Sequence, residues 1–227
     1  MSSSFQRLNN TGDIAVAPSV LSADFSRLVE EIKAVEEGGG DFLHLDIMDG
    51  HFVPNITFGP IIVEAITKLT SLPVISHLMI EDPKNFAERF VSAGSSLVSF
   101  HWEAYHSGHE KVIDIIRNLD CCTGLAVNPD TPLSKVEHLL EEIDCLLVMT
   151  VFPGFGGQAF MPEVLEKIEL AARLKKERGY RYVIEVDGGV NSDNAPLVRK
   201  AGGQILVAGT AVFKSDDYTR AISALRG

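Results

Sequence analysis

The strongest constraint on the fold is a series of eight short apolar segments that recur along the whole chain of 227 residues. Most of them are nearly continuous apolar runs rather than alternating ones, a pattern typical of parallel strands that are covered on both faces. The predicted strands cover residues 15–21, 42–48, 73–79, 97–102, 123–128, 146–151, 182–186 and 205–208.

Helical patterns with recognisable starts lie between these segments. The predicted starts are Asp24, Asp82-Pro83, Thr131-Pro132 and Pro162, with a further helix after Val190. Eight strand–helix units without a linker or low-complexity break indicate an α/β fold, a single (β/α)8 TIM barrel. The alternative, an open doubly wound sheet, usually has a glycine-rich turn after its first strand, whereas residues 22–24 read Ser-Ala-Asp.

We assign residues 14–227 to the barrel, which would be the catalytic domain. Residues 1–13 are rich in Ser and Asn, contain Arg7 as their one basic side chain and lack the pattern of a signal or transit peptide, so we expect a disordered lead-in. The three cysteines, at positions 121, 122 and 145, do not form a disulfide or zinc-finger pattern. A reduced, cytoplasmic location is therefore expected.

The charge balance argues against two classes of partner. The chain has 31 acidic and 20 basic side chains and a formal net charge of −11. Nucleic acids and anionic membranes select for clustered Lys and Arg, so neither is expected as a partner. No apolar run approaches the roughly 20 residues that span a bilayer.

Acidic and imidazole side chains gather at the predicted strand ends, where a barrel of this kind carries its chemistry. His44 and Asp46 are two residues apart, so they share one face of their strand. His77 ends the third strand and Asp187 the seventh. Two imidazoles and two carboxylates suit a divalent transition metal such as zinc, iron or manganese.

Each of these residues alone is as readily a loop cap or a hydrogen-bonded structural residue. Four of them at the same end of three strands favour a site. Asp49 lies beyond its strand next to Gly50 and is predicted to be a turn residue. His101 and Glu103 are expected to have supporting or structural roles. The remaining histidines are predicted to face solvent: His51, His106, His109 and His138.

Three glycine-containing segments follow the last three strands: residues 153–158, Gly188-Gly189 and Gly209-Thr210. Glycine lets backbone N–H groups approach an anion, and phosphate sites after strands seven and eight recur in this fold. The loop at 153–158 could also act as a mobile lid. A metal, two carboxylates and a phosphate site together indicate epimerisation at a carbon next to a carbonyl.

Several longer motifs closely resemble those of the ribulose-phosphate 3-epimerase family. They occur in the family's order from about Ala15 to the C-terminus, at residues 17–25, 44–55, 77–79, 149–151, 153–158 and 185–189. The resemblance implies an isomerase that interconverts D-ribulose 5-phosphate and D-xylulose 5-phosphate through an enediolate, in the pentose phosphate pathway or the Calvin cycle. It also implies a homo-oligomer, a dimer or a hexamer.

The resemblance implies roles for individual residues. His44, Asp46, His77 and Asp187 would hold one divalent metal ion (zinc, iron, manganese or cobalt), with Asp46 and Asp187 also the acid–base pair. The residues that would contact the sugar phosphate are His44, His77, Asp187, Ser19, Met48, Met79, Met149, Gly154, Phe155, Gly156, Gly157, Gly188, Gly189, Gly209 and Thr210.

Two positions depart from the family pattern. Ile75 stands where an Asp is expected two residues before His77, and Phe152 replaces a polar residue before the glycine-rich loop. If that Asp orients His77, metal affinity would be lower here. Two alternatives stay open, a D-allulose 6-phosphate epimerase and an inactive phosphosugar-binding barrel. The segment 57–59 and Gly156-Gly157 favour the pentulose, and the presence of both acids favours catalysis.

Overall fold

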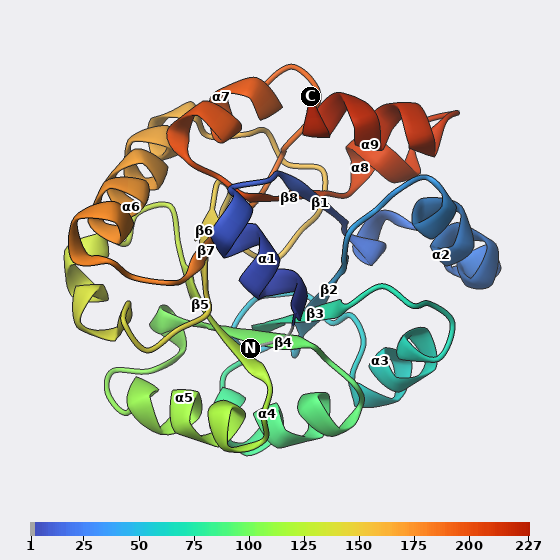
Figure 1. Cartoon of the computed structure of the whole chain (residues 1–227). Helices are drawn as coiled ribbons and strands as arrows, with labels where there is room; N and C mark the ends of the chain where they lie inside the picture. The colour runs from blue at the N-terminus through green and yellow to red at the C-terminus, as the bar shows by residue number, and fades with distance from the viewer. Residues whose placement is uncertain (1–2) are drawn as a thin grey trace.

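The computed structural model describes residues 3–227, and Figure 1 shows eight parallel strands enclosed by a ring of helices. The strands are β1 (Ala15–Pro18), β2 (Leu43–Met48), β3 (Val74–Met79), β4 (Leu97–His101), β5 (Cys122–Val127), β6 (Cys145–Met149), β7 (Val183–Asp187) and β8 (Ile205–Ala208). Their order is β1-β8-β7-β6-β5-β4-β3-β2, and a single parallel bridge between Ser19 and His44 joins β1 to β2. The predicted TIM barrel is confirmed.

The connecting segments run over the outside of the strands. The α-helices are α1 (Ser3–Thr11), α2 (Leu28–Glu37), α3 (Pro60–Thr67), α4 (Pro83–Ser92), α5 (His109–Asn118), α6 (Leu165–Arg178), α7 (Ala195–Ala201), α8 (Thr210–Phe213) and α9 (Tyr218–Arg226). Asp24 and Asp82 cap helical turns as predicted, because each side chain accepts a hydrogen bond from a backbone N–H two or three residues later.

The helix predicted after Thr131-Pro132 is wrong. The segment instead forms two 3₁₀ turns, η4 (Leu133–Lys135) and η5 (Glu137–Leu139). Leu133, Val136 and Leu139 are all buried. Their spacing of three residues matches the three residues per turn of a 3₁₀-helix, which explains why the tighter coil buries all of them. Four further 3₁₀ turns are η1 (Val20–Ser22), η2 (Phe25–Arg27), η3 (Trp102–Ala104) and η6 (Pro162–Val164).

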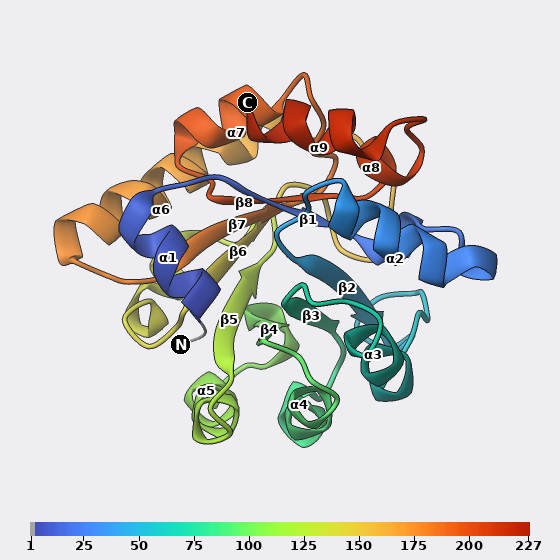
Figure 2. The ribbon, with the colours of Figure 1, turned by 45° about the vertical axis from the view of Figure 1, so that its right-hand side comes forward.

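The N-terminal segment also differs from the prediction of a disordered lead-in over 1–13. Residues Ser3–Thr11 form α1, which lies across one end of the barrel (Figure 2), whereas Met1 and Ser2 are outside the described residues. Phe5 and Leu8 are each only 1% exposed. They pack among residues at the starts of the strands, so α1 covers an apolar floor that the barrel would otherwise expose to water.

Ile75 belongs to this same apolar floor. It is fully buried in one cluster with Phe5, Leu8 and Phe42, two residues below His77 on the inner face of β3. The departure from the family pattern therefore places an apolar side chain against α1. Over residues 3–227, no helix is both long and apolar enough to cross a membrane.

Candidate active site

The four predicted metal ligands come from three strands whose inner faces meet inside the barrel. His44 and Asp46 lie on β2, His77 on β3 and Asp187 at the end of β7. His44 and His77 are completely buried, and Asp46 is 5% exposed. Parallel register places Asp46 directly beside His77, so one imidazole and one carboxylate face each other at the same height of the barrel.

The donor atoms of these four side chains converge. Asp46 Oδ1 lies 3.3 Å from both His44 Nε2 and His77 Nδ1, which are themselves 3.3 Å apart. Asp187 Oδ2 lies 3.8 Å from His44 Nε2 and 3.7 Å from His77 Nδ1. One ligand atom from each residue lies within 4.8 Å of all the others. Two nitrogens and two carboxylate oxygens in this arrangement fit a divalent transition metal.

The two carboxylates are in opposite electrostatic situations. Burial disfavours charge on both. At Asp46, the charge and hydrogen bond of His44, followed by those of His77, outweigh the effect of burial and hold the pKa of Asp46 well below its usual range. Burial and the neighbouring charge of Asp46 raise the pKa of Asp187 to about 7. A pair of acids whose pKa values are pushed apart is the arrangement expected of an acid and a base that work together.

The two imidazoles also differ. The pKa of His77 falls to about 3, chiefly because burial disfavours its charged form. Burial acts in the same direction on His44, but the carboxylates of Asp46 and Glu185 overcome it and raise the pKa of His44 well above its usual value. The buried site therefore favours a positive charge near His44, which a metal ion would also supply.

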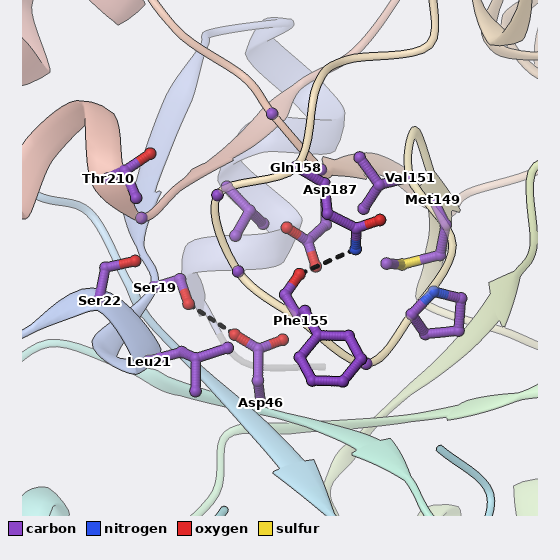
Figure 3. Close-up of a pocket in the computed structure, with 18 of the residues that line it drawn as sticks. Ser19, Leu21, Ser22, Asp46, Met149, Val151, Phe155, Gln158, Asp187 and Thr210 are labelled. Carbon is purple, nitrogen blue, oxygen red and sulfur yellow. Dashed lines mark hydrogen bonds between the residues drawn. The ribbon is translucent and has the colours of Figure 1, made fainter. Parts of the chain in front are cut away.

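Two further side chains hold the predicted metal ligands in place. Glu185, completely buried, lies with Oε1 2.9 Å from His44 Nδ1, and its Oε2 accepts a hydrogen bond from the Cys145 thiol at 3.4 Å. Ser19 donates a 2.5 Å hydrogen bond to Asp46 Oδ2 across the gap between β1 and β2, which Figure 3 shows as a dashed line. Sequence reasoning missed the role of Glu185, although its spacing of two from Asp187 indicates the same inner face of β7.

The structure also tests the roles predicted for the other histidines and for Asp49. His101 Nε2 lies 2.8 Å from His77 Nε2, in line with the supporting role predicted for it. The prediction that His109 faces solvent is wrong, because it is 4% exposed, stacks on Trp102 and has its Nε2 2.7 Å from the Trp102 carbonyl oxygen. The side chain of Asp49 accepts hydrogen bonds from the backbone of residues 51, 52 and 81, so its prediction as a turn residue is confirmed. The three exposed histidines are His51, His106 and His138.

A pocket opens above these ligands at the carboxyl ends of the strands, and Figure 3 shows Asp46 and Asp187 directed into it. The predicted site residues that line it are Ser19, Asp46, Met48, Met79, Met149, Gly154, Phe155, Gly156, Gly157, Asp187, Gly188, Gly189, Gly209 and Thr210. His44 and His77, also predicted to contact the sugar phosphate, are completely buried and are not among the lining residues. The lining residues that sequence reasoning missed are Leu21, Ser22, Val151, Pro153, Gln158, Val190 and Val207. Five of them lie in segments that the sequence singled out as motifs, without an individual role: Leu21, Ser22, Val151, Pro153 and Gln158. Val190 and Val207 lie outside those motifs and carry no such signal.

Two glycines in the wall of the pocket are required by close packing. A Cβ at Gly188 would lie 2.6 Å from Cγ2 of Val151, and one at Gly189 would lie 2.6 Å from the backbone nitrogen of Phe160. Both residues have positive φ, at 125° and 67°. Gln158 donates to the backbone carbonyls of Phe152 and Phe155, which folds the glycine-rich loop back over the pocket.

Fold and site together define a (β/α)8-barrel protein with two buried acids and two buried imidazoles at the carboxyl ends of its strands. Residues 15–213 match the model of the ribulose-phosphate 3 epimerase family. The chain is 50% identical over 215 residues to ribulose-phosphate 3-epimerase of Bacillus subtilis (strain 168), covering 94% of this chain and 99% of that one. It is 45% identical over 215 residues to the chloroplastic ribulose-5-phosphate-3-epimerase of Arabidopsis thaliana, covering 94% and 76% respectively. The chain belongs to the ribulose-phosphate 3-epimerase family, whose members are isomerases.

Solved structures with low sequence identity support the fold alone. A 3-hexulose-6-phosphate synthase is 19% identical with a TM-score of 0.67, covering 94% of this chain and 98% of that chain. A thiamine phosphate pyrophosphorylase from Pyrococcus furiosus is 20% identical with a TM-score of 0.63, and the match covers 96% of each chain.

Proposed function

We propose that this chain interconverts D-ribulose 5-phosphate and D-xylulose 5-phosphate by proton transfer at C3. The observation that carries the proposal is the pair of acids, Asp46 from β2 and Asp187 from β7, which converge on one pocket with their pKa values displaced in opposite directions. Membership of the family supports the choice of substrate.

The chemistry requires two groups because the configuration at C3 is inverted. C3 is adjacent to the C2 carbonyl, so loss of its proton gives a planar enediolate that can be protonated on either face. Asp46, ionised and held by the Ser19 hydroxyl, would take the proton from one face. Asp187, with a pKa of about 7, would deliver a proton to the other, and the roles exchange in the reverse direction.

A divalent metal ion, one of zinc, iron, manganese or cobalt, is part of the proposal. Held by His44, Asp46, His77 and Asp187, it would supply positive charge beside the two oxygens of the enediolate. The chain itself contributes an apolar wall of three methionines, Met48, Met79 and Met149, each at most 4% exposed. This wall keeps water away from the reactive carbon.

The phosphate end of the substrate would lie against the glycine-rich side of the pocket. The residues that line the pocket include no Lys or Arg. Backbone N–H groups around Gly156, Gly157 and Gly209, with the hydroxyls of Ser22 and Thr210, would therefore bind the phosphate. The proposal also includes a place in the pentose phosphate pathway or the Calvin cycle and a cytoplasmic location. It further includes a homo-oligomer, a dimer or a hexamer, and light scattering of the purified protein measures this oligomeric state.

Proton NMR of D-ribulose 5-phosphate in deuterated buffer tests the reaction. We expect deuterium at C3 together with D-xylulose 5-phosphate, and loss of both signals after chelation and in Asp46→Asn and Asp187→Asn. Asp114→Asn, a change of the same kind at an exposed position on α5, should leave the exchange unchanged. Exchange that survives complete metal removal would overturn the metal's role. Exchange of D-allulose 6-phosphate alone, or phosphate-ester binding without exchange, would overturn the proposed activity.

A further inference from the structure

A row of three side chains extends from the site behind His77. His77 Nε2 lies 2.8 Å from His101 Nε2, and His101 Nδ1 lies 3.2 Å from Glu103 Oε2. The two rings stack at 5.0 Å and are completely buried, while the Glu103 side chain is 19% exposed. His101 ends β4 and Glu103 lies in the turn after it, so both are outside the set of four converging side chains that includes His77.

The outer end of this row has a fixed orientation. Glu103 Oε1 accepts a 2.8 Å hydrogen bond from the backbone N–H of Asn128 and another from the hydroxyl of Thr131. Lys167, which donates to the carbonyl oxygens of residues 128 and 129, holds the same loop in place. The carboxylate is therefore bound to the loop through one oxygen and presents the other to His101.

The direction of each hydrogen bond follows from that end. A carboxylate can only accept, so Nδ1 of His101 must carry a hydrogen, which leaves Nε2 of a neutral His101 as an acceptor. Nε2 of His77 must then donate, so Nδ1 of a neutral His77 carries a lone pair. This Nδ1 is the atom that lies 3.3 Å from Asp46 Oδ1, among the converging donors. Asp46 is also a carboxylate and would favour a hydrogen on this nitrogen, so the two ends of the row compete for the tautomer of His77. The lone pair on Nδ1 is the outcome that the Glu103 end favours.

We propose that Glu103 is a positioning residue that acts through His101 to set the tautomer of His77, so that Nδ1 is always the metal-binding nitrogen. The inference rests on the proposed metal site. Neither Glu103 nor His101 would contact the substrate or the metal ion, and both would act through His77.

Glutamine at position 103 would reverse the direction of each hydrogen bond in the row. The amide oxygen must face the backbone N–H of Asn128, because that N–H can only donate a hydrogen bond. The amide NH₂ would then donate to His101 Nδ1, His101 Nε2–H would donate to His77 Nε2, and His77 Nδ1 would carry the hydrogen. A protonated Nδ1 cannot bind a metal ion but donates readily to Asp46, so the metal-free fold keeps its contacts.

Zinc affinity, measured by competition with a chromophoric chelator, tests the inference. We expect Glu103→Gln to lower the affinity about 10- to 100-fold, with the urea midpoint of the metal-free protein unchanged. His101→Gln should stay within a few-fold of the wild type, because its amide can accept from His77 and donate to Glu103. A purely structural role predicts the opposite order, since Glu103→Gln keeps the side chain's shape and His101→Gln removes a buried ring. Thr131→Val is the matched control for the loop contact and should bind zinc like the wild type.

Nitrogen-15 NMR of the histidine rings gives a second readout that needs neither metal nor substrate. In the metal-free wild type we expect a hydrogen on Nε2 of His77, and in Glu103→Gln a hydrogen on Nδ1. The same tautomer in both proteins, or equal zinc affinity, overturns the inference. A wild type that binds zinc without epimerising any substrate would overturn the proposed function alone, because both of these measurements are independent of turnover.

Discussion

Two carboxylates contact the imidazoles behind the site, Glu185 fully buried beside His44 and Glu103 partly exposed beside His101. Their hydrogen-bond partners differ, and this difference decides how each responds to substitution by glutamine. Oε1 of Glu103 accepts a hydrogen bond from a backbone N–H, whereas the hydrogen bond that the second oxygen of Glu185 accepts within residues 3–227 comes from the thiol of Cys145. A glutamine at 185 can therefore turn its oxygen toward His44 Nδ1 and its NH₂ toward sulfur. The direction of the hydrogen bond to His44 survives that substitution, and only the negative charge is lost.

We therefore predict that Glu185→Gln lowers zinc affinity by about 10-fold, at the low end of the effect of such supporting residues. The effect should be smaller than that of Glu103→Gln, even though Glu185 is in direct contact with a ligand and Glu103 is not. Chelator competition on both variants, side by side, measures the difference. An affinity lost more completely in Glu185→Gln than in Glu103→Gln would show that charge, not hydrogen-bond direction, controls the ligands.

At the scale of elements, Glu36 joins the end of α2 to the loop before β3. Its carboxylate accepts hydrogen bonds from the side chains of Thr70 and Ser71 and from the backbone N–H of Ser71. The hydroxyl of Ser71, followed by that of Thr70, lowers the pKa of Glu36 below its ordinary 4.5. A lowered pKa in the folded state means that this contact stabilises the fold fully above about pH 4.5 and is lost as the pH falls through the folded value.

Glu36→Gln should accordingly reduce the free energy of unfolding by about 1 kcal/mol at pH 7, and the deficit should shrink as the pH approaches 3. Urea unfolding of the metal-free protein at pH 7, 5 and 3.5 measures this trend without interference from metal loss. Glu177→Gln, at an exposed position on α6, should show no deficit at any of these pH values. A deficit for Glu36→Gln that is constant with pH would contradict the assignment.

The helix α1 makes a separate contribution at the opposite end from the pocket. The Phe5 ring lies 4.9 Å from that of Phe42, and Gln204 donates to the backbone carbonyl of Leu8. Removing the ring leaves a void in a buried floor, so Phe5→Ala should cost about 3 kcal/mol of unfolding free energy with kcat unchanged. Leu197→Ala on α7, where the side chain is 50% exposed, should cost far less. Equal stability of Phe5→Ala and the wild type would show that α1 does not pack on the barrel in solution.

The sequence was most informative where the pattern of neighbouring residues along the chain decides the local structure. Apolar runs predicted all eight strands, and the two-residue spacing of His44 and Asp46 placed both on one inner face. Three features depend on distant partners and could not be predicted this way. The helix at 3–11 is mostly polar, and its Phe5 and Leu8 are buried only because the barrel has an apolar floor. The burial of His109 depends on Trp102. The role of Glu185 depends on His44, 141 residues earlier in the chain.

At the scale of the whole molecule, the site lies where the ring of strands is least continuous. Backbone pairing runs without interruption from β1 through β8 to β2, and a single bridge closes the remaining gap. The Ser19–Asp46 hydrogen bond crosses that gap. The remaining ligands come from β3 and β7, so a metal ion would connect three strands across the interior. Because the metal-free site places two acids close together in an acidic protein, an ion should favour the folded state strongly.

Metal binding should therefore stabilise the barrel as well as complete the site. A ligand present at 100 times its Kd stabilises the folded state by about 2.7 kcal/mol, which for a chain of this size corresponds to a rise in Tm of about 5–10 °C. We expect this rise when zinc is added to chelator-treated protein, measured by calorimetry. Asp187→Asn should abolish it because one of the four ligands is lost, and Asp114→Asn should retain it. A Tm that does not respond to zinc, in protein shown to be metal-free and folded, would mean that the four side chains do not bind the ion together.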